Sequence, residues 1–127
     1  MVAGQADRVS LCVATAAGLI RIAATGFTLA WTHSVERIEW WERWQVTPAG
    51  LEIVEARVRG SGAGMEPPEG ARPVEGGWSY RPVLPPRPDL VLAASGATGG
   101  GWTLCAAGEC RVLASKPGPP VTLSPCD

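Results

Sequence analysis

His33 is the single histidine of the chain, and it lies in the segment 27–36, where an alternating apolar run meets a short polar cluster. Histidine titrates near neutral pH and is a common metal ligand, so His33 beside Ser34 and Glu36 could bind a ligand or transfer a proton. In a continuing strand, however, His33 would face the opposite way from Ser34 and Glu36, and cooperation between them needs a turn at Ser34. The structural alternative is a histidine that bonds a backbone carbonyl at a strand end.

The motifs of the common enzymes and metal sites are not found around these residues. Ser34 lacks the Gly-x-Ser-x-Gly turn that exposes a nucleophile in many hydrolases. Several glutamates could supply oxygen ligands for a hard cation, but carboxylates on strands more often face solvent and pair with arginines across a hairpin. The acids are Glu36, Glu39, Glu42, Glu52 and Glu55, and the arginines Arg37, Arg43 and Arg57. We expect a protein that is not an enzyme, with no catalytic residues, metal or cofactor.

The glycine-rich run 60–64 is a second candidate for binding. It lacks the Lys-Ser/Thr pair of a phosphate-binding loop, because Met65-Glu-Pro-Pro follows it. It predicts a long loop over residues 60–71, and long loops are often functional. Its backbone amides could still bind a carboxylate. The expected ligand-binding or partner-binding residues are Thr32, His33, Ser34, Glu36, Gly62, Gly64 and Met65.

The composition limits the class of protein. A chain of 127 residues with 46% apolar residues can bury the core of one domain, so we predict one domain over residues 1–127 with residues 1–7 flexible. A formal charge of −1 without a basic stripe argues against nucleic-acid binding. The longest uncharged stretch is interrupted by glycines, so no transmembrane segment is expected. Residues 1–10 do not resemble an export signal, since Asp7 and Arg8 lie where an apolar core should be.

The four cysteines are Cys12, Cys105, Cys110 and Cys126, and none is spaced as in zinc knuckles. Cys105 and Cys110 enclose a four-residue turn, so in a hairpin they would face each other across two strands. Cys12 and Cys126 would close a long loop, which stabilises a chain strongly. We prefer these two disulfides among the three possible pairings, the alternative being four buried thiols in a reducing cytosol. Disulfides predict an oxidising compartment, the periplasm or the cell exterior.

The pattern along the chain favours strands. Gly and Pro are abundant, at 16 and 12 residues, and apolar residues alternate with polar ones in short runs. The run 35–46 also fits a helical stripe, but three tryptophans in five residues favour a strand, with Trp40 and Trp44 on one face and Trp41 on the other. Residues 82–88, rich in proline, should form a long extended loop. We predict an all-β fold: an antiparallel β-sandwich or partly open barrel with 8–10 short strands, whose exposed tryptophans mark a partner surface.

Several separated motifs resemble one bacterial family. Phe27-Thr-Leu-Ala-Trp-Thr-His-Ser-Val-Glu36, Trp44-Gln-Val, Gly50-Leu-Glu-Ile-Val-Glu-Ala-Arg57, Gly62-Ala-Gly-Met65, Pro68-Glu-Gly70 and Gly77-Trp78 occur in the order found in the domain of unknown function 1850. The resemblance covers roughly residues 10–95. It implies a small exported protein encoded beside the permease of TRAP transporters that use a TAXI-type solute-binding protein.

Two functions from different classes follow. The first is a non-catalytic periplasmic accessory domain that contacts a TRAP permease or TAXI-type binding protein through Thr32–Glu36 and the 60–70 loop. The alternative is a module centred on His33 that binds a small organic acid or a divalent metal. An exposed tryptophan cluster with a flat surface favours the first function, and a concave pocket that contains His33 and a charged partner favours the second.

Overall fold

The computed structural model describes residues 9–32, 38–59, 69–94 and 100–126. Within these residues the fold is all-β, as predicted, with eleven strands and no helix. No helix in the described part could therefore cross a membrane. The strands are β1 (Ser10–Thr15), β2 (Gly18–Ile22), β3 (Gly26–Thr32), β4 (Glu39–Thr47), β5 (Gly50–Arg59), β6 (Arg72–Val74), β7 (Gly77–Tyr80), β8 (Leu90–Leu92), β9 (Trp102–Ala106), β10 (Glu109–Leu113) and β11 (Val121–Cys126).

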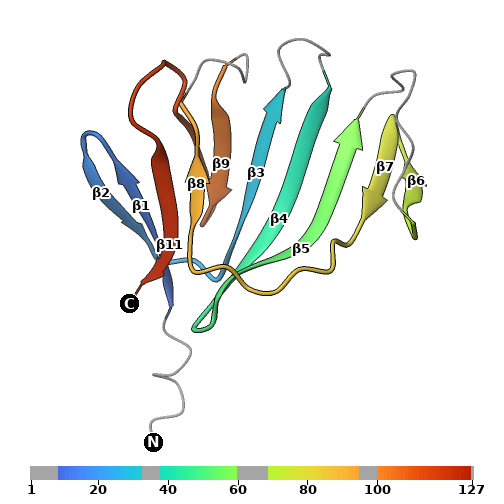
Figure 1. The fold of residues 1–127 in the computed structure, drawn as a ribbon, viewed down its shortest axis with the longest axis horizontal. Coiled ribbons are helices and arrows are strands. Elements are labelled where there is room, and N and C mark those ends of the chain that lie inside the picture. The colour runs from blue at the N-terminus through green and yellow to red at the C-terminus, as the bar shows by residue number, and fades with distance from the viewer. Residues whose placement is uncertain (1–8, 33–37, 60–68, 95–99, 127) are drawn as a thin grey trace, which may run out of the picture.

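The strands form two open antiparallel sheets, which confirms the sandwich and not the barrel (Figure 1). The smaller sheet has the order β2-β1-β11-β8, and the larger has the order β10-β9-β3-β4-β5-β7-β6. The larger sheet is wider by three strands, and its β7 and β6 edge extends beyond the smaller sheet (Figure 1).

The core lies between the two sheets. Leu11, Val13 and Leu123 of the smaller sheet are fully buried, as are Leu29 and Leu104 of the larger sheet. Because side chains alternate between the faces of a strand, each strand of the larger sheet has an inner face toward this core and an outer face away from it. Trp44 is buried with the core, and Trp41 lies on the outer face, as the alternation predicts.

The structure has one strand more than the predicted upper limit of ten. The unpredicted strand is β6, which directly follows the loop predicted over residues 60–71. Pro73 has no backbone N–H, so it disfavours an internal strand, but β6 is an edge strand and pairs with β7 alone. Residues 82–88 do connect β7 to β8 without a named strand, and Arg87 pairs with Leu51 by two backbone hydrogen bonds.

Both disulfides are present with the preferred pairing. Cys12 and Cys126 join β1 to β11, and Cys105 and Cys110 face each other across the β9–β10 hairpin. The described residues include no free cysteine. Two disulfides indicate an oxidising setting outside the cytoplasm.

Candidate functional site

A single row of side chains crosses the outer face of the larger sheet. The strand register places Thr103, Ala30, Trp41, Arg57 and Ser79 side by side on β9, β3, β4, β5 and β7. Toward the ends of the strands, a second row contains Thr32 on β3, Glu39 on β4 and Arg59 on β5. These two rows bring together an indole, two guanidinium groups, a carboxylate and hydroxyl groups on a surface made of regular strands.

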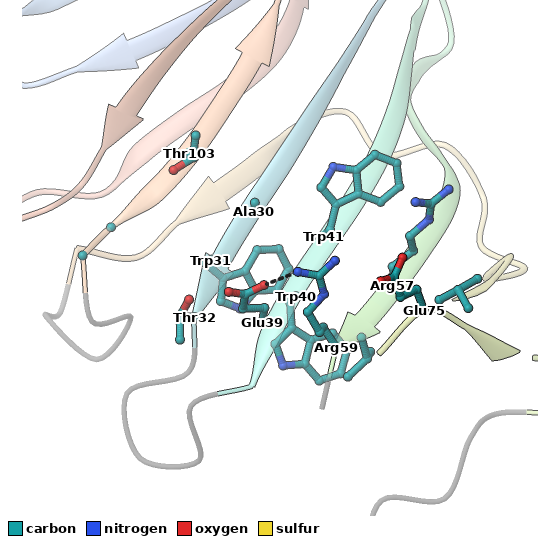
Figure 2. A pocket seen from close by; sticks show the side chains of 14 residues that line it. Ala30, Trp31, Thr32, Glu39, Trp40, Trp41, Arg57, Arg59, Glu75 and Thr103 are labelled. Atoms are coloured by element: carbon teal, nitrogen blue, oxygen red, sulfur yellow. Dashed lines mark ion pairs between the residues drawn. The ribbon is translucent and has the colours of Figure 1, made fainter. Parts of the chain in front are cut away.

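The outer face is hollowed at this place, with a volume of about 600 Å³, which we call the outer hollow. Three adjacent strands form its floor with residues 30–32, 39–41 and 57–59. Ala30, Thr32 and Thr103 have short side chains, so they leave a depression beside the larger Trp41 and Arg57 (Figure 2). Pockets for small ligands have volumes of about 300 to 1,000 Å³, so the outer hollow has the size of a ligand site.

Arg57 is held in the outer hollow from two sides. Its guanidinium carbon lies 4.7 Å from the centre of the Trp41 ring, which is a cation–π contact. Its Nε donates to a carboxylate oxygen of Glu55 at 2.7 Å. Among the described residues, Glu55 accepts the hydrogen bond that this guanidinium donates, and the donor is Nε. The two terminal nitrogens therefore present the fork that matches a carboxylate or a phosphate.

Glu55 acts as an anchor for its neighbours. In addition to Arg57, it accepts a hydrogen bond from the Ser79 hydroxyl at 2.8 Å and lies 3.5 Å from a terminal nitrogen of Arg43. Burial by itself would raise the pKa of Glu55, but the hydrogen bonds from Arg57 and Ser79 and the two arginine charges outweigh it and lower this pKa. Glu55 is therefore charged at neutral pH and fixes Arg57 in place.

Arg59 is the second guanidinium of the outer hollow. Its terminal nitrogen lies 3.6 Å from Glu39, and both side chains are more than half exposed (Figure 2). Such an exposed pair contributes little to stability, and it can open to accept another partner. The tip of the β6–β7 hairpin lies against Arg59, since a Cβ on Gly76 would be 3.4 Å from its side chain. Val74 and Glu75 of this hairpin complete the rim.

The inner face of the same sheet carries several aromatic side chains. One cross-strand row contains four partly buried tryptophans, Trp102, Trp31, Trp40 and Trp78, with Val58 between the last two. The Trp31 ring is stacked on Trp40 at 6.2 Å and tilted by 46° against Trp102 at 4.6 Å. One row further along, the Glu42 carboxylate accepts a hydrogen bond from the Trp44 indole at 3.0 Å. Burial raises the pKa of Glu42 and outweighs the effect of this hydrogen bond. Burial, and then the charge of Glu42, raises the pKa of Tyr80.

Glu42→Gln should stabilise the protein at neutral pH. Because the folded state raises the pKa of Glu42, it binds more protons than the unfolded chain above the ordinary pKa, and stability falls as pH rises through the raised value. Glutamine has no charge to desolvate and can still accept from Trp44. We expect a melting temperature higher by a few degrees at neutral pH and no difference at about pH 4, where glutamate is largely protonated. A variant that is less stable at neutral pH would contradict the pKa direction.

The structure places few of the predicted site residues. Thr32 lines the outer hollow. His33, Ser34, Glu36, Gly62, Gly64 and Met65 lie outside the described residues. Thr32, the last residue of β3, and Glu39, the first residue of β4, both line the outer hollow.

Sequence reasoning treated Arg57 as a surface partner of a glutamate and did not single out Ala30, Arg59 or Thr103. Trp41 was the available signal, because it lies on the polar face of its strand between Glu39 and Arg43. A large indole among charged side chains on the solvent face is a mark of a binding surface. Glu36 lies outside the described residues. Among the described glutamates, Glu55 and Glu39 pair with arginines on the outer face, whereas Glu42 lies on the inner face. The described residues contain no cluster suited to a metal ion.

Comparison with known proteins identifies the family. The model of the domain of unknown function DUF1850 matches residues 27–113, which is more than half of the chain. The chain belongs to the DUF1850 family. The match runs from β3 to β10, so the larger sheet with its outer hollow is the part of this DUF1850 protein that the family model covers. No curated protein and no solved structure matches the chain.

Proposed function

We propose that this DUF1850 protein is a non-catalytic binding domain that takes a small organic acid in the outer hollow. The observation that carries the proposal is the fixed guanidinium of Arg57, stacked on Trp41 and tied by Nε to Glu55. A guanidinium that is already oriented loses little side-chain freedom when it binds a carboxylate, so more of the interaction energy remains for affinity.

The other residues of the outer hollow suit the rest of such a ligand. Trp41 supplies an aromatic surface, and Ala30 and Val74 supply apolar contacts. Thr32 and Thr103 supply hydroxyl groups that can donate to or accept from a polar substituent. An aromatic and apolar surface with a few placed polar groups is typical of a ligand pocket.

The proposal places the protein in the periplasm or at the cell exterior, in agreement with its two disulfides. The resemblance to exported relatives encoded beside TRAP transporters supports the same location. The carboxylate bound by Arg57 could also belong to an acidic side chain of a TRAP permease or TAXI-type binding protein. This accessory role is the second candidate, and the experiment below separates it from binding of a free acid.

Arg57→Gln should weaken the binding of a dicarboxylate, because the substitution removes the charged fork but keeps a polar side chain. Losing hydrogen bonds to a charged group predicts an affinity lower by about 10-fold to 100-fold. We would titrate the protein with succinate, malate and citrate and measure the heat of binding. Arg57→Lys, which keeps the charge without the fork, should show an intermediate loss.

Arg21→Gln is the matched control, since Arg21 is an exposed arginine on β2 of the smaller sheet. It should bind like the wild type. Equal affinity of the wild type and Arg57→Gln for an acid that binds would overturn the proposal. Absence of heat with every free acid, together with binding of a purified transporter component that Arg57→Gln abolishes, would assign Arg57 to the partner instead.

A further inference from the structure

A second hollow of about 290 Å³ lies on the outer face, near the β6 edge of the larger sheet. We call it the arginine hollow, because Arg43, Arg72 and Arg81 line it together with Glu55 and Ser79. These three arginines come from β4, β6 and the residue after β7. Among the described residues, none lines both this hollow and the outer hollow.

The charges in the arginine hollow do not balance. Glu55 is the single carboxylate among the described residues that line it, and Glu55 already accepts hydrogen bonds from Arg57 at 2.7 Å and from Ser79 at 2.8 Å, with Arg43 at 3.5 Å. The lowered pKa of Glu55 shows that it stays charged beside these arginines. Within the described part of the chain, neither Arg72 nor Arg81 forms an ion pair. Among the described residues, Arg72 and Arg81 therefore have no acidic partner, and Arg43 shares Glu55 with Arg57.

This excess of positive charge is confined to the arginine hollow, because the protein as a whole is not basic. The whole chain carries a formal charge of −1, with 11 basic and 12 acidic residues. Gathering three guanidinium groups around one hollow is unfavourable unless something compensates for their charge. An anion that several guanidinium groups share is the simplest compensation, since these groups bind oxyanions by paired hydrogen bonds.

We propose that the arginine hollow binds a small oxyanion, a phosphate or a carboxylate, between Arg72 and Arg81. Arg43, whose terminal nitrogen lies 3.5 Å from Glu55, adds a third positive charge to the hollow. The Ser79 hydroxyl already donates to Glu55, so the arginines supply the hydrogen bonds to the anion. The small volume of the hollow suits an inorganic phosphate or a short dicarboxylate and excludes a cofactor of nucleotide size.

The test is calorimetric titration of the full chain with inorganic phosphate and, separately, with succinate. The Arg72→Ala/Arg81→Ala double variant should bind the anion at least 10-fold more weakly than the wild type. The matched control is Arg21→Ala/Arg87→Ala, which removes the same two charges elsewhere, from exposed side chains. The control separates a local site from the general effect of net charge, and its affinity should stay close to that of the wild type.

The Arg57→Gln variant separates this inference from the proposed function. Anion binding that survives Arg57→Gln and is lost in Arg72→Ala/Arg81→Ala supports the arginine hollow, and the anion that binds identifies the ligand as phosphate or carboxylate. Binding that is lost in Arg57→Gln but unchanged in the double variant belongs to the outer hollow and overturns the inference. An equal loss in the double variant and its control, or no heat with either anion, also overturns it.

Discussion

Cys12→Ala/Cys126→Ala should lower the free energy of unfolding by about 4 to 5 kcal/mol. The disulfide joins residues that are 114 positions apart, so it restricts nearly the whole unfolded chain. Removing it releases that restriction and favours the unfolded state. Alanine is the suitable replacement because Cys12 is buried, at 8% exposure, and serine would bury a hydroxyl group there. Denaturant unfolding monitored by tryptophan fluorescence measures the change.

The second disulfide provides the internal comparison. Cys105 and Cys110 are five positions apart, and the same loop-entropy argument gives about 2 kcal/mol for this short loop. Cys105→Ala/Cys110→Ala should therefore cost less than half as much as the long-range pair. A small domain has only about 5 to 15 kcal/mol of stability. In a reducing medium the Cys12→Ala/Cys126→Ala variant also loses the second disulfide, so it should come close to unfolding. Equal costs for the two pairs would contradict the argument from loop length.

Gly77→Ala should destabilise the protein by about 3 kcal/mol, at the upper end of the usual cost of overpacking. Gly77 opens β7 and pairs with Arg59 of β5. A Cβ at this position would overlap the backbone carbonyl oxygen of Val58 and lie 2.9 Å from the Arg59 Cα. Because these neighbours are backbone atoms, they cannot move aside without breaking the pairing of β7 with β5.

The same substitution should damage both hollows. Displacing β7 also displaces β6, which carries Val74 at the rim of the outer hollow and Arg72 in the arginine hollow. Thermal unfolding and anion titration of the variant check the two effects together. Gly118→Ala is the control, since nothing lies within 4 Å of a Cβ there. An unchanged melting temperature in Gly77→Ala would contradict the close approach of β7 to β5.

Much of the sandwich could be predicted because the alternation of apolar and polar residues along a strand is a local property of the sequence. Phe27, Leu29 and Trp31 of β3 alternate with polar or small residues, so the sequence indicates both the strand and its buried face. The separation of Trp41 from Trp40 and Trp44 follows from the same rule and is confirmed. The β6 strand was missed because Pro73 is a poor strand former, and its pairing depends on β7, which is a tertiary contact.

The binding surface could not be predicted in the same way. The row Thr103, Ala30, Trp41 and Arg57 is assembled from four strands, and β9 lies more than 70 residues beyond β3. Whether Thr103 or its neighbour Leu104 stands beside Ala30 depends on the register, which local patterns do not determine. An irregularity between Arg43 and Trp44 also shifts the pairing of β4 with β5. Without it, Glu55 would not anchor both Arg43 and Arg57.

The central claim is that a carboxylate binds at the Arg57 guanidinium over Trp41. Heteronuclear NMR of the wild-type protein during a dicarboxylate titration tests it most directly, by following the Nε–H signals of Arg57 and Trp41. If a carboxylate binds there, both signals should shift and saturate at one common ligand concentration, while the signal of the Trp44 indole, which donates to Glu42, stays unchanged. Saturable shifts elsewhere, with the Arg57 and Trp41 signals unmoved, would contradict it.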